Sequence, residues 1–143
     1  MGQPVQVVID DGTLRLDVPL DLAAVEGIRA EVASAADGWG FAELADLEVV
    51  VSELVTNAIV HAHSPSVVEV VLLEAGCIEV RVADAAAEPP VMRIPYQQHT
   101  RGLGLHIVDA LCEAWGVRDV DGVGKTVWAR LSSAAPDGAD DLG

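Results

Sequence analysis

With 143 residues, the chain has the length of one domain with a single hydrophobic core. Hydrophobic residues make up 51% of it and aromatic residues only 3%, which predicts an ordered core of Val, Leu, Ile and Ala and excludes a disordered chain. The net charge of −15 opposes binding to nucleic acid or to an anionic membrane, because both need clustered Lys and Arg, but it permits a partner protein with a basic surface.

The first residues and the apolar runs predict a cytoplasmic protein. Met1-Gly-Gln-Pro4 lacks the basic and apolar regions of a signal peptide, and the apolar runs are far too short to span a membrane. Cys77 and Cys112 do not have the spacing of metal ligands, and their apolar neighbours predict two buried thiols.

The first half of the chain predicts a hairpin followed by two helices. Two β-rich runs at 5–9 and 13–18 flank Asp10-Asp11-Gly12, a strong turn signal. Asp21 can cap a helix that extends to about residue 34. A longer helix is predicted over 42–61 because apolar residues recur on one stripe of it: Leu44, Leu47, Val50, Val51, Leu54, Val55, Ala58 and Ile59.

The second half of the chain predicts strands at 67–73 and 77–83, a helix at 103–114 and strands at 117–120 and 126–131. The order ββ-α-α-ββ-α-ββ predicts an α+β fold, a two-layer α/β sandwich whose mixed, mainly antiparallel sheet has helices on one face. Residues 1–135 are expected to form the single domain, and 136–143 a flexible acidic tail.

A first candidate site lies on the predicted helix 42–61. Glu53, Asn57 and His61 follow one another at intervals of four residues, so they share one face of the helix. A carboxylate, an amide oxygen and an imidazole can serve a metal–phosphate site, and Mg²⁺ needs few protein oxygens because it keeps several waters. Alternatively, this stripe is a solvated helix face with a histidine placed favourably near the C-terminal end of the helix dipole.

A second candidate is the start of the predicted helix 103–114, where Gly102 and Gly104 stand beside apolar residues. Amides freed at a helix start attract phosphate, and glycines allow close approach. The segment is not a dinucleotide fingerprint, because Ile107 occupies the position of the third glycine. The alternative is a glycine hinge before an ordinary helix.

Two further features are weak when taken alone. Gly124-Lys-Thr126 is similar to the end of a P-loop, but Asp119 replaces the first glycine and a strand-like run follows, so a β-turn in a hairpin is the better interpretation. Asp84 ends the predicted strand 77–83, and its carboxylate can accept a hydrogen bond from the amino group of a base, although aspartates at strand ends are common.

In this order, the four features resemble the family of ATPases and kinases that share the Bergerat fold: gyrase, Hsp90, MutL and histidine kinases. The closest likeness is to the anti-sigma-factor serine kinases of Gram-positive bacteria. Segment 53–61 resembles their N-box, 101–111 their glycine-rich box and 124–128 their final box. The resemblance covers about 21–131 and implies that 1–135 is a histidine-kinase-like ATPase domain.

The resemblance implies a role for each candidate residue, with ATP and Mg²⁺ as cofactors. Glu53 would be the general base, Asn57 would hold Mg²⁺ and Asp84 would receive the adenine amino group. Thr126 would support the adenine contact, and 85–100 would be the ATP lid. The full set of implied ATP-binding residues is Asn57, His61, Asp84, Arg101, Gly102, Leu103, Gly104, Leu105 and Thr126.

Two functions follow from this resemblance. The first is an anti-sigma factor with protein-serine kinase activity that phosphorylates an antagonist of anti-sigma factors. The second is a binding module of the same fold that transfers no phosphate, which Ala86 favours because the family has glycine there. A solitary ATPase is a third option. The expected partners are a sigma factor and the antagonist, with no nucleic acid and no membrane, and a homodimer paired through the edge of the N-terminal hairpin.

Overall fold

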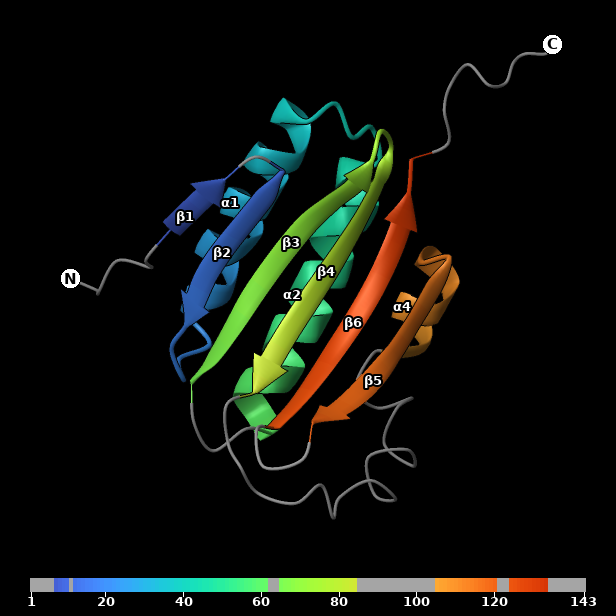
Figure 1. The fold of residues 1–143 in the computed structure, drawn as a ribbon. Coiled ribbons are helices and arrows are strands. Elements are labelled where there is room, and N and C mark those ends of the chain that lie inside the picture. Colours follow the sequence, from blue (N-terminus) through green and yellow to red (C-terminus); the bar gives the residue numbers. More distant parts are fainter. Residues whose placement is uncertain (1–6, 11, 62–64, 85–104, 121–123, 134–143) are drawn as a thin grey trace, which may run out of the picture.

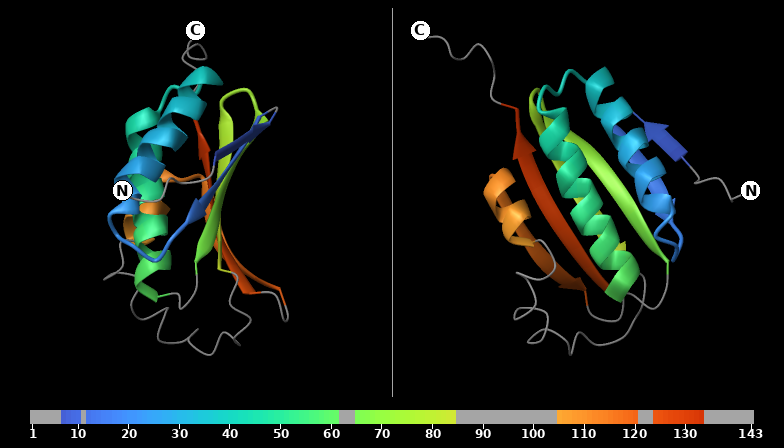
Figure 2. Two further views of the ribbon diagram at one scale, coloured as in Figure 1. Left: turned by 90° about the vertical axis from the view of Figure 1, so that its left-hand side faces the viewer. Right: turned by 180° about the vertical axis from the view of Figure 1, so that it is seen from behind.

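The protein forms a two-layer sandwich in which one six-stranded sheet carries all the described helices on a single face (Figures 1 and 2). The computed structural model describes residues 7–10, 12–61, 65–84, 105–120 and 124–133. The strand order is β1-β2-β3-β4-β6-β5, and each of the five neighbouring pairs is antiparallel. The strands are β1 Val7–Asp10, β2 Thr13–Val18, β3 Ser66–Glu74, β4 Cys77–Asp84, β5 Ala114–Val120 and β6 Gly124–Ser132. The helices are α1 Ala24–Gly38, α2 Leu44–His61 and α4 Leu105–Leu111.

This architecture confirms the predicted α+β sandwich with helices on one face. The sheet was expected to be mixed but mainly antiparallel, and among the described strands it contains no parallel pair. Hairpin connections explain three of the five pairs, β1–β2, β3–β4 and β5–β6, because short turns can join only antiparallel neighbours. In the first hairpin Asp10 pairs with Thr13, and Gly12 takes a φ of 77°, which glycine adopts without the strain that a Cβ would cause.

Helix α1 begins later than the sequence predicts. Asp21 Oδ1 accepts a hydrogen bond from the backbone N–H of Ala23 at 3.0 Å, so its carboxylate stabilises the turn before the helix rather than the first helical turn. The helix starts at Ala24 and runs to Gly38, four residues beyond the expected end at 34. Its buried residues are Ile28, Val32 and Ala36.

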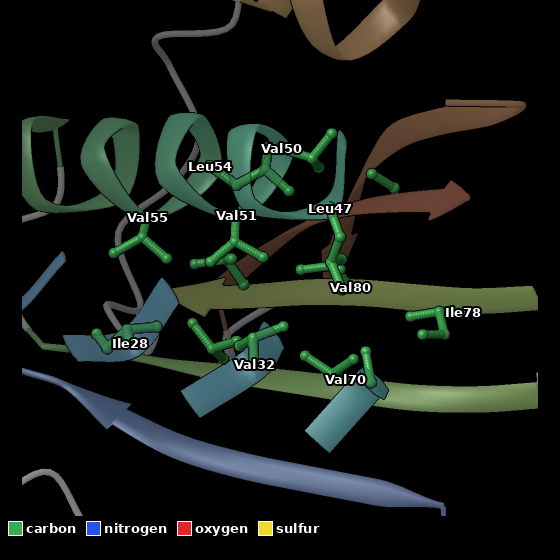
Figure 3. Close-up of a cluster of buried hydrophobic side chains, with 14 of the residues drawn as sticks. Ile28, Val32, Leu47, Val50, Val51, Leu54, Val55, Val70, Ile78 and Val80 are labelled. Atoms are coloured by element: carbon green, nitrogen blue, oxygen red, sulfur yellow. The ribbon is translucent and has the colours of Figure 1, made fainter. Parts of the chain in front are cut away.

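Helix α2 contributes most of the helical side of the core. Five residues from its predicted apolar stripe are buried: Leu47, Val50, Val51, Leu54 and Val55. Of these, Leu47, Val51 and Val55 extend toward strands β3 and β4 (Figure 3). The strands contribute the side chains of alternate residues to the same core, including Val70, Ile78 and Val80. Each such side chain stabilises the fold by about 1.5–3 kcal/mol through the removal of apolar surface from water. Within the described residues, no helix is long and apolar enough to cross a membrane.

Helix α4 ends earlier than predicted. It ends at Leu111, and Ala114, which was expected to be the last helical residue, begins β5. The chain changes from helix to strand at this point because Glu113 N–H already donates to the carbonyl of Arg130 on β6 at 2.9 Å, and Ala114 pairs with Arg130. Continuing the helix would forfeit this strand pairing.

The two cysteine thiols have different surroundings. Cys77 is buried, as predicted, and burial raises its pKa. Cys112 is only half-buried and lies just beyond α4. Burial also raises the pKa of Cys112, to about 12, and the carboxylates of Asp109 and Asp46 add to the shift. Both thiols are free of disulfide bonds.

The face of the sheet opposite the helices carries a row of ion pairs centred on Glu79. Arg81 Nε lies 2.7 Å from Glu79 Oε2, and Arg130 donates to Oε1 from its terminal nitrogen at 2.9 Å and from Nε at 3.2 Å. Glu69 extends the row, because Arg81 and Arg15 approach its oxygens at 3.4 and 3.7 Å. Burial raises the pKa of Glu79, but the hydrogen bonds and charges of the two arginines outweigh burial, and the net shift is downward.

Trp128 lies on the same open face, packed over Gly116. The guanidinium groups of Arg118 and Arg130 lie 5.3 and 5.4 Å from its ring centroid. Gly116 pairs with Trp128 across β5 and β6, and a Cβ at this glycine would lie only 3.1 Å from the indole nitrogen. Because Gly116 has no side chain, it leaves room for the indole ring of Trp128 on the neighbouring strand.

Candidate functional site

The strongest sign of a site in this fold is the side chain of Asn57 on α2. Its amide nitrogen, Nδ2, is buried and has no hydrogen-bond partner, and among the described residues it is the only buried side-chain nitrogen or oxygen in this condition. Leaving a buried amide unpaired costs about 1–3 kcal/mol. An amide left in this state makes Asn57 a candidate position at which a ligand or a water supplies the missing partner.

The position of Asn57 along α2 supports this interpretation. The fully buried stripe of the helix ends at Val55, and Ala58 and Ile59 are only half-buried. Val60 is 56% exposed. The apolar pattern continues in the sequence through this last turn, but full burial does not, so Asn57 lies where the fully buried stripe of α2 ends.

Glu53 lies one helical turn before Asn57 and is half-buried. Within the described part of the chain its carboxylate forms no ion pair and no hydrogen bond. Spacing of four residues places it on the face of Asn57, as predicted. A carboxylate beside an unpaired amide is able to accept a proton without first breaking a structural contact.

Two other predicted residues, His61 and Asp84, are the last residues of two elements that pack against each other. His61 is the last residue of α2 and Asp84 the last residue of β4, and these two elements pack against each other. Asp84 pairs in register with Ser66 on β3 and Lys125 on β6. The side chains of His61 and Asp84 lie outside the described part of the structure.

Thr126 does not lie where the predicted adenine role requires it. On β6, the side chains of Val127, Ala129 and Leu131 belong to the core, so strand alternation turns Thr126 to the open face with Trp128 and Arg130. Its register partner on β4 is Ala83. Lys125 instead occupies the position opposite Asp84, on the core side. Counting alternate residues back from the apolar run Val127–Leu131 gives this result from the sequence.

The predicted phosphate-binding segment falls mainly outside the described residues: Arg101, Gly102, Leu103 and Gly104. Leu105, also predicted to bind ATP, is the first residue of α4, and its side chain is not among those described. The helix itself packs against α2, and Val108 anchors it in the core. Helix α4, which follows this segment in the chain, therefore lies beside the helix that carries Asn57.

Among the described residues, no group of three or more His, Cys, Asp or Glu side chains could hold a metal ion. Mg²⁺ can be held differently, by one amide oxygen together with phosphate oxygens and waters. The oxygen of Asn57 is a ligand of this type, and its unpaired nitrogen is a donor suited to a phosphate oxygen. The site therefore fits a magnesium–nucleotide complex better than a bare metal ion.

Comparison with known proteins agrees with the fold. The family model of the histidine kinase-like ATPase domain matches residues 18–131, from the end of β2 to the end of the core part of β6. No curated protein matches the chain. ATP binding is typical of this family, which includes anti-sigma-factor kinases. Because the match spans most of the chain and contains every element of the helix layer, the protein is a member of the histidine kinase-like ATPase domain family.

Proposed function

We propose that the protein binds Mg–ATP at the end of α2 and transfers the γ-phosphoryl group to a serine of a partner protein. The observation that carries this proposal is the buried, unpartnered amide of Asn57. Its nitrogen would donate to a phosphate oxygen and its oxygen would bind the metal. Mg²⁺, when bound, would neutralise phosphate charge and so favour attack by the hydroxyl.

Glu53 would act as the general base in this transfer. The serine oxygen attacks the γ-phosphorus, the bond from that phosphorus to the bridging oxygen of ADP breaks, and the serine proton passes to the carboxylate of Glu53. The absence of any ion pair at Glu53 within the described residues supports this role, because a base held in a structural contact is less available.

The remaining contacts rest on the family resemblance. Asp84 would accept a hydrogen bond from the adenine amino group, and the amides of 102–104 would bind the phosphates. We do not assign an adenine contact to Thr126, since it faces the open side of the sheet. We assign the β6 position beside the adenine to Lys125 instead, because it pairs with Asp84.

The proposed partners are a sigma factor and its competing antagonist, because segments 53–61 and 101–111 resemble those of anti-sigma-factor serine kinases most. The antagonist would carry the serine that receives the phosphate. The protein would act in the cytoplasm. A homodimer paired through β1 is part of the proposal, since β1 is an edge strand with one row of backbone groups unpaired in the sheet.

Nucleotide binding is tested first, by calorimetry with Mg–ATP. Asn57→Ala should weaken binding by about 100-fold or more, since a ligand atom and a phosphate donor are lost together. Thr56→Ala is the matched control, because Thr56 is also half-buried on α2 but lies about 100° around the helix from Asn57. Unchanged affinity in the Asn57 variant would contradict the site.

Phosphoryl transfer is tested with γ-labelled ATP and candidate antagonist proteins. Glu53→Gln should remove at least about 99% of the transfer rate and retain Mg–ATP affinity, because a general base commonly contributes 10²–10⁴-fold. Glu48→Gln serves as control, since Glu48 lies on the same helix in an exposed ion pair with Arg29 at 3.9 Å. Binding without transfer to any candidate would favour the second function, a non-catalytic binding module. Ala86 supports that alternative because the family has glycine at this position.

A further inference from the structure

Strand β5 forms one border of the sheet, at the opposite side from β1 (Figure 1). Among the described strands it pairs only with β6, so its outer row of backbone groups has no strand beside it. It has seven residues, whereas β1 has four. An edge of this kind is a template to which another extended segment can add through backbone hydrogen bonds. Such a segment would also meet the side chains that β5 and β6 present on each face.

On the open face, the indole of Trp128 extends from β6 over Gly116 of β5. A Cβ placed on Gly116 would lie 3.1 Å from the indole nitrogen Nε1 and 3.2 Å from Cζ2. Nε1 donates no hydrogen bond to any described residue. It is also not a buried unpartnered atom, so it is accessible to solvent. An accessible N–H donor therefore lies above a residue without a side chain, on the strand that borders the sheet.

Arg118 places a positive charge beside this donor. Its side chain is exposed, and its guanidinium lies 5.3 Å from the ring centroid of Trp128. In the part of the chain that the structure describes, this ring contact is its only interaction, and it meets no carboxylate. Arg130, the other guanidinium on the ring, instead donates to the carboxylate of Glu79 at 2.9 Å. The charge of Arg118 is thus available to a carboxylate from another molecule.

The other face of β5 offers an apolar contact. Val117 lies between Gly116 and Arg118 in the strand, so its side chain is on the helix side of the sheet. Its register partner Val127 packs against the core, but Val117 itself is 40% exposed. An apolar side chain on an added strand would cover it. The edge therefore suits a segment that has acidic residues on one face and apolar residues on the other.

We propose that β5 receives an extended segment of a partner protein in which acidic and apolar residues alternate. A glutamate opposite Gly116 would accept hydrogen bonds from Trp128 Nε1 and from the guanidinium of Arg118, and its apolar neighbour would cover Val117. Adjacent strands lie about 4.8 Å apart, so the glutamate side chain can reach the indole across the glycine. The chain's net charge of −15 opposes an acidic segment elsewhere, which confines it to this edge. The inference is independent of nucleotide binding.

The test uses calorimetry on the full chain, without nucleotide, and a capped peptide of alternating valine and glutamate as long as β5. The peptide should bind, and its counterpart with glutamine for glutamate should bind at least about tenfold more weakly, because charge-assisted hydrogen bonds are lost. Arg118→Gln should weaken binding of the glutamate peptide by about tenfold and leave that of the glutamine peptide nearly unchanged.

Arg15→Gln is the matched control. Arg15 is another arginine of the open face, 53% exposed, but it lies on β2 beside Glu69, far along the strand order from β5. Its variant carries the same change of net charge as Arg118→Gln and should bind the glutamate peptide as the wild type does. An equal loss in both variants would show a general effect of charge and would overturn the site at β5.

Nuclear magnetic resonance locates the contact. The indole N–H resonance of Trp128, assigned by its loss in Trp128→Phe, should shift when the glutamate peptide is added, and those of Trp39 and Trp115 should not. Backbone amides of β5 should exchange more slowly with the peptide present, and those of β1 should not. Protection of β1 in place of β5 would contradict addition at this edge.

Four further results would overturn the proposal: no binding of the glutamate peptide, equal affinity for the two peptides, unchanged affinity in Arg118→Gln, or a dimer that the peptide dissociates in sedimentation. The last result would assign the edge of β5 to a second copy of this chain. None of these results bears on the proposed function, because titration with Mg–ATP tests that function separately.

Discussion

The fold treats two buried polar groups in opposite ways: the carboxylate of Glu79 on the open face of the sheet, and the amide nitrogen of the half-buried Asn57 on the helix side. Glu79 is only 2% exposed, and Arg81 and Arg130 together donate three hydrogen bonds to its oxygens. Asn57 has a buried amide nitrogen with no partner. The fold thus satisfies the Glu79 carboxylate with its own side chains and leaves the Asn57 amide nitrogen without a partner, which is why we place the proposed ligand site at Asn57.

The largest expected loss of stability comes from a core substitution on α2, and it tests whether the helix beside Asn57 is tightly packed. Leu54→Ala removes a buried side chain three residues before Asn57 and should lower the free energy of unfolding by about 2–5 kcal/mol, measured by urea denaturation. A loss below about 1 kcal/mol would mean that this part of α2 is not tightly packed. The contrast between a packed core and a site beyond it would then not hold.

A smaller effect is expected at Glu79, and it depends on pH. Glu79→Gln should cost about 1–3 kcal/mol at neutral pH, because two arginines lose a charged acceptor. The pKa of Glu79 is lowered in the fold, so its contribution is complete above the ordinary value of 4.5 and is lost as the pH falls through the lower folded value. The difference between wild type and variant should therefore shrink below pH 4.5 in urea denaturation, and a constant difference would contradict the ion pairs.

The smallest expected change in stability is at Asn57, although its effect on binding is large. Asn57→Ala relieves the cost of the unpaired nitrogen but also removes the packing of a half-buried side chain, so the free energy of unfolding without nucleotide should change by less than about 1 kcal/mol, in either direction. The same urea measurement decides the matter. A loss comparable with that of Leu54→Ala would show that Asn57 is a structural residue and would remove the distinction from Glu79.

The sequence predicts the elements well where their hydrophobic period is unambiguous. The stripe of α2 and the alternation of β3 and β4 give the two layers and most of the core, including Leu54 and Val80. The run after Leu111 is apolar in a way that suits both helix and strand, and only pairing with Arg130 on β6 decides that Ala114 starts a strand.

The candidate site is less predictable because it depends on register and on missing partners. The motif at 124–128 gives the position of Thr126 but not its face, which only the separate alternation of Val127, Ala129 and Leu131 indicates. The spacing of Glu53 and Asn57 predicts a shared helix face, which the structure has. Whether the amide of Asn57 finds a partner in the fold is a property of the whole packed core, and no local pattern contains it.

Gly116 and Trp128 have a consequence for how sequences of this fold can vary. A Cβ at position 116 would meet the indole at 3.1–3.3 Å, closer than side chains normally approach. Any larger residue at 116 therefore calls for a smaller residue at 128, and the stack of Arg118 and Arg130 on the ring would be lost with it. Across relatives these positions should covary, with glycine at 116 accompanying tryptophan at 128.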